Sequence, residues 1–188
     1  MLSIIGLALR IFLLLISAVV LALSVTLARQ QSVGAVPPET GFGTFVGSAG
    51  LVASAIGMAG LWFDQINGKI LMGLDTLMSL LYLAGASALL VAVKIVSSCT
   101  ATDDISEVQR VTNKIMNGGC VGSDEGPICP NAFSLDGKDL TKSRCQIAKA
   151  DYVFEYAGFI FGFAMVAVGF LLHRRGRGGT PTPNRSYT

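Results

Sequence analysis

The chain has 188 residues, of which 52% are hydrophobic and 14% are charged, and its formal net charge at pH 7 is +2. Soluble domains carry about 25% charged residues, so a content this low, gathered into loops and a tail, excludes an ordinary soluble helical protein. The small, dispersed net charge also excludes a nucleic-acid-binding surface, and we expect no nucleic-acid partner. Four uncharged apolar runs instead predict one all-α integral membrane domain, a bundle of four transmembrane helices.

The first predicted helix covers residues 5–28 and contains the apolar run 11–28, which begins after Arg10. A cleaved signal peptide is the alternative, with Arg10 in its basic region and small residues from Thr26 to Ala28 near a cleavage point. The run has 18 residues, whereas the apolar region of a signal peptide usually has about 7–15. This length favours a retained helix and leaves the alternative open.

The second predicted helix, residues 42–63, is rich in small residues, and the fourth carries a similar pair. Small residues four apart lie on one helix face and let another backbone approach closely. We predict that these residues mediate helix packing, within the chain rather than in a dimer. They are Gly43 with Gly47, Ala53 with Gly57, and Gly158 with Gly162.

The third predicted helix, residues 70–94, follows a short turn and carries Asp75 near its start. Arg10 enters the membrane from the same side. Ionisable residues in membrane helices are costly and are usually paired, so we predict an Arg10–Asp75 ion pair. Lys94 and Glu155 lie at comparable depth on the other side, and we expect them to pair likewise. The alternative is that each side chain extends to the nearer interface.

The fourth predicted helix covers residues 151–173, and its flanks differ in character. Residues 152–172 are 21 in number, which at 1.5 Å per residue span about 30 Å, the thickness of a hydrocarbon core. Aromatic residues lie at the start of this run, and Arg174, Arg175 and Arg177 follow it. Basic flanks face the cytoplasm, so an up-down bundle has both termini inside and loop 95–150 outside. Residues 176–188 are predicted to form a disordered cytoplasmic tail.

All four cysteines, Cys99, Cys120, Cys129 and Cys145, lie in the long loop. An even number of cysteines in an extracytoplasmic segment predicts disulfides. Of the three pairings, we favour Cys99–Cys145 with Cys120–Cys129 nested inside, because packed helices three and four would bring the outer two cysteines together. The loop has no His and no C-x₂₋₄-C spacing, so we expect no metal site and no cofactor.

A short amphipathic helix is predicted at residues 104–117 of the loop. Asp104 and Glu107 form a capping-box pattern at its start. Four apolar residues follow at helical spacing: Ile105, Val108, Val111 and Ile115. The apolar face would cover the outer end of the bundle or lie on the lipid surface.

The sequence offers no catalytic group. The single His is His173, beside the arginines at a helix end, and no Cys/His or Ser/His set can form on one side of the membrane. We therefore expect no enzyme and no catalytic residue. A transporter, or an accessory subunit of a channel, would use Arg10 and Asp75 as part of an ion path. The sequence lacks the paired helix breaks that many transporters show.

The chain resembles the MARVEL-domain proteins, which are tetraspan membrane proteins, and is most similar to small fungal members related to the non-classical export protein. The similarity covers residues 5–175, so we assign residues 1–175 to a MARVEL-like four-helix domain. It rests on several short segments. They are Trp62 and Asp64, Leu74-Asp75-Thr76-Leu77-Met78, Leu83-Ala84-Gly85-Ala86, Ser98-Cys99, Arg144-Cys145-Gln146 and Ala148-Lys149-Ala150.

This resemblance implies a non-enzymatic protein of the plasma membrane that organises membrane microdomains or acts in vesicle trafficking. It implies membrane lipids as partners, including sterol or sphingolipid domains, and other membrane proteins, including further copies of the chain. The residues add one specific expectation. Arg174, Arg175 and Arg177 would contact anionic lipids, at about 1 kcal/mol for each well-placed arginine.

Overall fold

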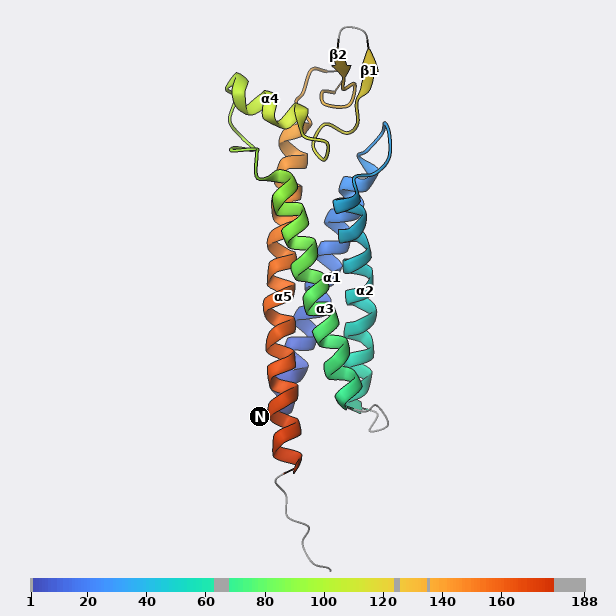
Figure 1. Ribbon diagram of the computed structural model, residues 1–188, viewed down its shortest axis with the longest axis vertical. Helices are drawn as coiled ribbons and strands as arrows, with labels where there is room; N and C mark the ends of the chain where they lie inside the picture. The colour runs from blue at the N-terminus through green and yellow to red at the C-terminus, as the bar shows by residue number, and fades with distance from the viewer. Residues whose placement is uncertain (1, 63–67, 124–125, 135, 178–188) are drawn as a thin grey trace, which may run out of the picture.

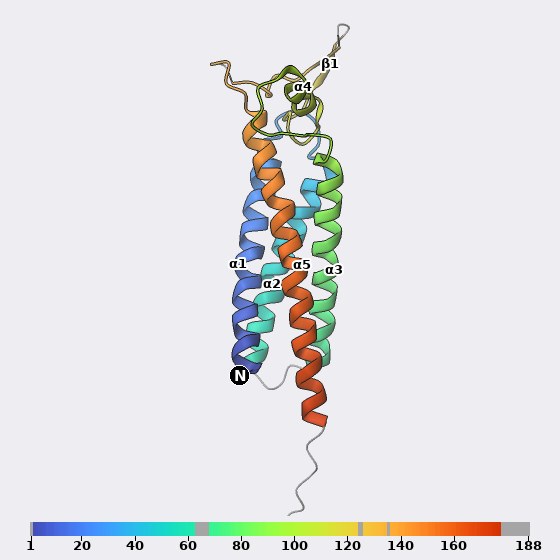
Figure 2. The same ribbon diagram turned by 90° about the vertical axis from the view of Figure 1, so that its left-hand side faces the viewer.

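Four long helices lie side by side in the computed structural model, and a small lobe covers one end of the bundle (Figures 1 and 2). The structure describes residues 2–62, 68–123, 126–134 and 136–177. The long helices are α1 (Leu2–Arg29), α2 (Pro38–Trp62), α3 (Gly68–Val93) and α5 (Thr141–Arg177). The lobe contains α4 (Asp104–Thr112) and a hairpin of β1 (Val121–Ser123) and β2 (Gly126–Ile128).

The described helices confirm the predicted all-α, four-span, up-down bundle. Four of them are long and apolar enough to cross a membrane: Ile4–Arg29, Pro38–Gly60, Gly68–Val93 and Thr141–Leu171. The start of α1 and the end of α5 lie at the same end of the bundle, opposite the lobe (Figure 1). The predicted tail falls almost entirely on residues 178–188, and most of the turn before α3 on residues 63–67, both outside the described residues.

All four long helices begin earlier than predicted, and the difference is largest for α2 and α5. α2 begins at Pro38 rather than residue 42, because proline is well suited to the first turn of a helix. α5 begins at Thr141, ten residues before residue 151. The carboxylate of Asp139 accepts a hydrogen bond from the Thr141 backbone N–H at 2.9 Å, which caps this start. The apolar run predicted the membrane-spanning part and missed the more polar extension into the lobe.

The predicted amphipathic loop helix is shorter and oriented differently from expectation. It ends at Thr112 rather than residue 117, and its N-cap is Asp103 rather than Asp104. The Asp103 carboxylate accepts from the Ser106 N–H at 2.9 Å. Ile105 and Val108 are 73% and 59% exposed, whereas Ser106 and Arg110 are buried. Of the two orientations considered, the one in which Ile105 and Val108 cover the end of the bundle is therefore wrong, because the hydrogen bonds of Arg110 determine the inward face of α4.

Both disulfides of the favoured pairing are confirmed, and no described cysteine is free. Cys99–Cys145 joins the segment after α3 to the first turns of α5. Cys120–Cys129 closes the β1–β2 hairpin, in which Val121 pairs with Ile128. A buried cluster that includes Leu89, Met116 and Ala148 surrounds the first disulfide. The lobe is therefore attached to the bundle by a covalent bond and by a shared core.

Candidate functional site

Buried polar side chains recur every seven residues along the inner face of α1. Arg10, Ser17 and Ser24 are 2%, 0% and 0% exposed. Seven residues make about two helical turns, so these side chains share one face and lie about 10.5 Å apart along the axis. They form three polar layers inside the bundle. We name them the terminal layer (Arg10), the middle layer (Ser17) and the lobe layer (Ser24).

Glycines of the antiparallel helix α2 repeat the same spacing and face each layer in turn. A Cβ atom at Gly57 would overlap the guanidinium of Arg10, and one at Gly50 would lie 2.7 Å from the Ser17 hydroxyl oxygen. A Cβ atom at Gly43 would overlap the Ser24 hydroxyl. The missing side chains on α2 therefore make room for the polar side chains of α1.

The terminal layer contains a bidentate ion pair between α1 and α3. Arg10 Nη1 donates to Asp75 Oδ1 at 2.5 Å, and Arg10 Nη2 donates to Asp75 Oδ2 at 2.6 Å. Both residues are buried. The structure thus brings together the two membrane charges that the sequence analysis placed at equal depth. In a buried bidentate pair each charge compensates the other, so the loss of one partner leaves an unpaired charge in the bundle.

The middle layer joins α1, α3 and α5. The hydroxyls of Ser17 and Tyr82 lie 2.7 Å apart, and Ser17 donates its own proton to the Leu13 carbonyl at 2.5 Å. Tyr82 is therefore the donor to Ser17. A Cβ atom at Gly158 of α5 would come within 2.8 Å of the Tyr82 ring. A cavity of about 20 Å³, lined by residues such as Arg10, Ser54 and Tyr82, lies between the terminal and middle layers.

The lobe layer holds two acidic residues of α5, Asp151 and Glu155, which are 0% and 1% exposed. Ser24 donates to Asp151 Oδ2 at 2.6 Å. Within the described residues, Asp151 Oδ1 and both carboxylate oxygens of Glu155 have no hydrogen-bond partner. The expected Lys94–Glu155 pair is wrong. Lys94 follows the inward-facing Val93 by one residue, about 100° around the helix, and its side chain is exposed.

The predicted packing residues are buried, and most of them lie where two helices meet. A Cβ atom at Gly47 would come within 2.6 Å of the Leu21 backbone, so α1 and α2 approach closely there. A Cβ atom at Gly162 of α5 would lie 3.2 Å from the Cβ atom of Ser79 on α3, a less close contact. The sequence analysis missed Gly50, Ser17, Ser24, Tyr82 and Asp151. The seven-residue repeat on α1 and α2 was the signal that could have found the first three.

The part of the chain that contains the four long helices matches a known family. A family model for the MARVEL domain, described as a membrane-associating domain, matches residues 3–170. The chain belongs to the MARVEL family. No curated protein and no solved structure matches the chain. The match covers all four long helices and the lobe, so the polar layers described above lie within this MARVEL domain.

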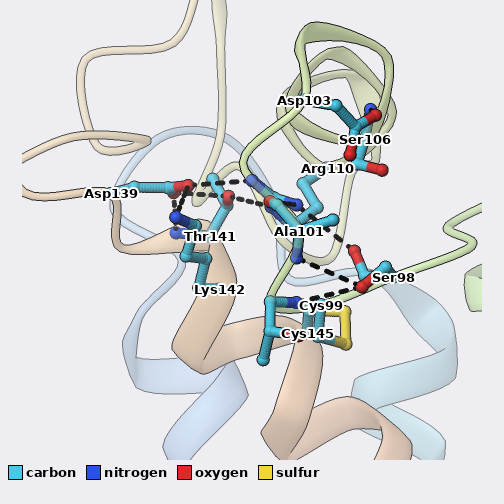
Figure 3. Close-up of polar contacts among 11 residues, drawn as sticks. Ser98, Cys99, Ala101, Asp103, Ser106, Arg110, Asp139, Thr141, Lys142 and Cys145 are labelled. Carbon is cyan, nitrogen blue, oxygen red and sulfur yellow. Dashed lines mark hydrogen bonds and ion pairs between the residues drawn. A yellow bond between two sulfur atoms is a disulfide. The ribbon is translucent and has the colours of Figure 1, made fainter.

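In the lobe of the MARVEL domain, the fully buried guanidinium of Arg110 holds several segments together (Figure 3). It donates to the carbonyls of Ser98 and Ala101 at 3.2 and 3.0 Å, and to Asp139 Oδ2 at 3.1 Å. Its Nε donates to the Thr141 hydroxyl at 3.2 Å. Burial alone would raise the pKa of Asp139, but hydrogen bonds from Thr141 and Arg110 outweigh it and hold this pKa below its usual value.

A second buried arginine, Arg144 of α5, holds the lobe at the point where the lobe meets the α1–α2 link. Arg144 donates to the carbonyls of Met116 and Asn131 at 3.1 and 2.8 Å. Gly118 adopts a positive φ of 73° beside this guanidinium, a conformation that glycine adopts readily. Its carbonyl accepts hydrogen bonds from Ser32 and Val33 of the link. Hydrogen bonds thus hold both loops at this end of the MARVEL domain.

Of the three predicted lipid-contacting arginines, the structure describes the side chain of one. Arg174 is exposed, and its guanidinium carbon lies 5.7 Å from the ring centre of Phe170. The side chains of Arg175 and Arg177 lie outside the described part of the structure. Among the described residues, no group of three or more His, Cys, Asp or Glu side chains is arranged to hold a metal ion.

Proposed function

We propose that this MARVEL protein organises lateral domains of the plasma membrane, or acts in membrane trafficking, without catalysing a reaction. The family assignment and the four spans support a protein that works within the membrane. The distribution of polarity supports contact with lipid, because polar groups lie inside the bundle and large apolar side chains lie outside. Phe12, Leu80 and Phe163 are 52%, 57% and 63% exposed.

One observation carries the proposal: an apolar groove between α2 and α3. Its volume is about 410 Å³, within the range of small-molecule sites. Phe45, Val52 and Ile56 line it from α2, and Leu74, Leu77 and Leu81 line it from α3. All six lie inside the candidate membrane spans, where the surrounding solvent is hydrocarbon. We propose that the groove holds the apolar part of a lipid, a sterol ring system or an acyl chain.

The two ends of the bundle support further parts of the proposal. We propose that both termini lie in the cytoplasm, where Arg174, Arg175 and Arg177 would attract anionic lipids of the inner leaflet. The two disulfides of the lobe suit an oxidising compartment. Other membrane proteins, including a second copy of the chain, remain proposed partners.

The alternative function, transport or channel assistance, relied on Arg10 and Asp75. In the structure these side chains bind each other in a buried pair, which gives both of them a packing role without any transport step. The experiment below also distinguishes the two functions.

The groove can be tested with photoactivatable sterol and phosphatidylcholine probes in liposomes that contain the full-length protein. We expect labelling to concentrate on peptides 45–56 and 74–81. Ser48→Phe, at an exposed position in the groove, should reduce it several-fold, whereas Ala22→Phe, exposed on α1, should leave it unchanged. Uniform labelling along all helices would contradict the groove as a lipid site. Ion or solute flux through the same liposomes would favour the alternative function.

A further inference from the structure

We propose that Asp151 and Glu155 in the lobe layer form a binding site for a hard metal cation, with Na⁺ and Ca²⁺ as the candidates. This proposal does not depend on the lipid-organising function. It rests on the bonding of the two carboxylates, on the space around them, and on a comparison with the terminal layer of the same bundle.

The first observation is that two buried carboxylates lack compensation by the protein. Ser24 donates to one of their four oxygens, and the other three have no hydrogen-bond partner among the described residues. None of the ion pairs within the described ranges includes Asp151 or Glu155. Unpaired buried charge is strongly unfavourable, and buried charges are normally paired or coordinate a metal.

The second observation is that the bundle is shaped around the Glu155 carboxylate. A Cβ atom at Gly85 of α3 would lie 2.7 Å from Glu155 Oε1, and one at Gly43 of α2 would lie 3.2 Å from the same oxygen. Ser24 of α1 lies against the same Gly43. The carboxylate therefore occupies the space where all four long helices meet, and two of them contribute no side chain there.

A further buried oxygen lies on the same face of α2. Thr40 is 1% exposed, and its hydroxyl has no hydrogen-bond partner among the described residues. Thr40 precedes Gly43 by three residues, so both lie on one side of the helix, with Thr40 one turn nearer the lobe. This unpartnered hydroxyl and the Ser24 hydroxyl could add oxygen ligands from two other helices to those of α5.

The third observation is that the terminal layer has the same plan and carries its own cation. In both layers a glycine of α2 faces a polar side chain of α1, beside a buried carboxylate of another helix. In the terminal layer the α1 position is Arg10, whose guanidinium neutralises Asp75. Two heptads further along, the α1 position is Ser24, which carries no charge. None of the described side chains supplies a positive charge to the lobe layer, so a bound cation or bound protons must neutralise its two carboxylates.

The available ligands determine the class of cation. They are carboxylate and hydroxyl oxygens, with no described imidazole or thiolate among them, and such oxygens favour hard cations over transition metals. Toward the middle of the bundle lies Tyr82, whose hydroxyl is already bonded to Ser17. The site lies at the lobe end of the bundle, close to one membrane surface.

Equilibrium binding of ²²Na⁺ and ⁴⁵Ca²⁺ to the full-length protein tests the proposal, in detergent and in choline chloride at pH 8. We expect saturable binding of one of these ions and a higher unfolding temperature in its presence. Glu155→Gln and Asp151→Asn should each weaken binding at least tenfold. Asp104→Asn removes an exposed carboxylate of α4 and should bind as the wild type does.

Unfolding without metal ions guards against a variant that merely misfolds. Glu155→Gln removes an uncompensated charge, so without metal ions it should unfold at a higher temperature than the wild type. When the ion is added, the unfolding temperature of the wild type should rise towards that of Glu155→Gln. If neither isotope binds the wild type above the level of the Asp151→Asn/Glu155→Gln double variant, and neither ion changes its unfolding temperature, the carboxyls hold protons instead and the proposal is wrong.

Discussion

Gly57 of α2 lies directly against the guanidinium of Arg10 on α1, at a separation that leaves no room for a Cβ atom. The same guanidinium binds Asp75 of α3 with both of its terminal nitrogens. A glycine on one helix thus makes room for an ion pair between two others. The middle and lobe layers repeat this relationship with Gly50 and Gly43, so the small residues of α2 fit polar side chains as well as a neighbouring backbone.

Gly57→Ala should destabilise the bundle, because the new methyl group must displace the Arg10 guanidinium. Overpacking of this kind costs about 1–3 kcal/mol. Gly73→Ala on α3 is the matched control, since a Cβ atom there meets nothing within 4 Å. That variant should be neutral, or more stable by up to about 1 kcal/mol from helix propensity. Thermal unfolding in detergent measures both, and equal stability of the two variants would contradict the close contact.

The Arg10–Asp75 pair should appear as strong coupling in a double-mutant cycle. Arg10→Ala or Asp75→Ala alone should cost about 3–5 kcal/mol, since each leaves an uncompensated buried charge. The double variant should cost clearly less than the sum of the two. Additive losses in unfolding free energy, or in expression level, would show that the pair does not act as a unit.

The two disulfides should contribute unequally to stability. Cys99–Cys145 spans 46 residues of sequence and Cys120–Cys129 spans 9. The loop-entropy model assigns them about 4 and about 2.6 kcal/mol. Replacement of each cysteine pair by serine, followed by unfolding, checks the order. Maleimide labelling before and after reduction should find no reactive thiol in the oxidised wild-type protein, and early labelling would contradict the pairing.

Acid should loosen the lobe through Asp139. Its folded pKa lies below the usual value, so its contribution is complete above about pH 4 and is lost as the pH falls through the folded pKa. Limited proteolysis between pH 5 and pH 2 should show the lobe becoming more accessible at the acid end. In the Asp139→Asn variant, the lobe should be more accessible to protease at pH 5 than in the wild type, and its accessibility should change less as the pH falls. The exposed Asp136→Asn should behave as the wild type does, and an identical acid response in Asp139→Asn would rule out this role.

The two incorrect expectations about side-chain orientation share one cause. Depth in the membrane placed Arg10 with Asp75 correctly, because both positions follow from counting residues along apolar runs. The same count placed Lys94 beside Glu155. Lys94 follows the inward-facing Val93 by one residue, however, so its side chain points away from the bundle. Periodicity likewise grouped Ile105 and Val108 on one face of the loop helix, and one of its two proposed orientations put that face against the bundle. Periodicity finds an apolar face without showing what that face contacts, and here the partners of Arg110 decide the orientation.

The sequence by itself determined the number of spans, the all-α class, the disulfide-bearing loop and the family resemblance. These properties depend on local composition and on residue counts. The bilayer thickness fixes the length of an apolar run that can span it, and an oxidising compartment allows the cysteines to form disulfides. Only the tertiary structure decided that glycines of α2 face the polar residues of α1, and that Glu155 and Asp151 lie buried among four helices with no counter-charge from the part of the chain that the structure describes. Those facts depend on the rotation of each helix about its axis. Side-chain packing between segments that are far apart in the chain determines this rotation.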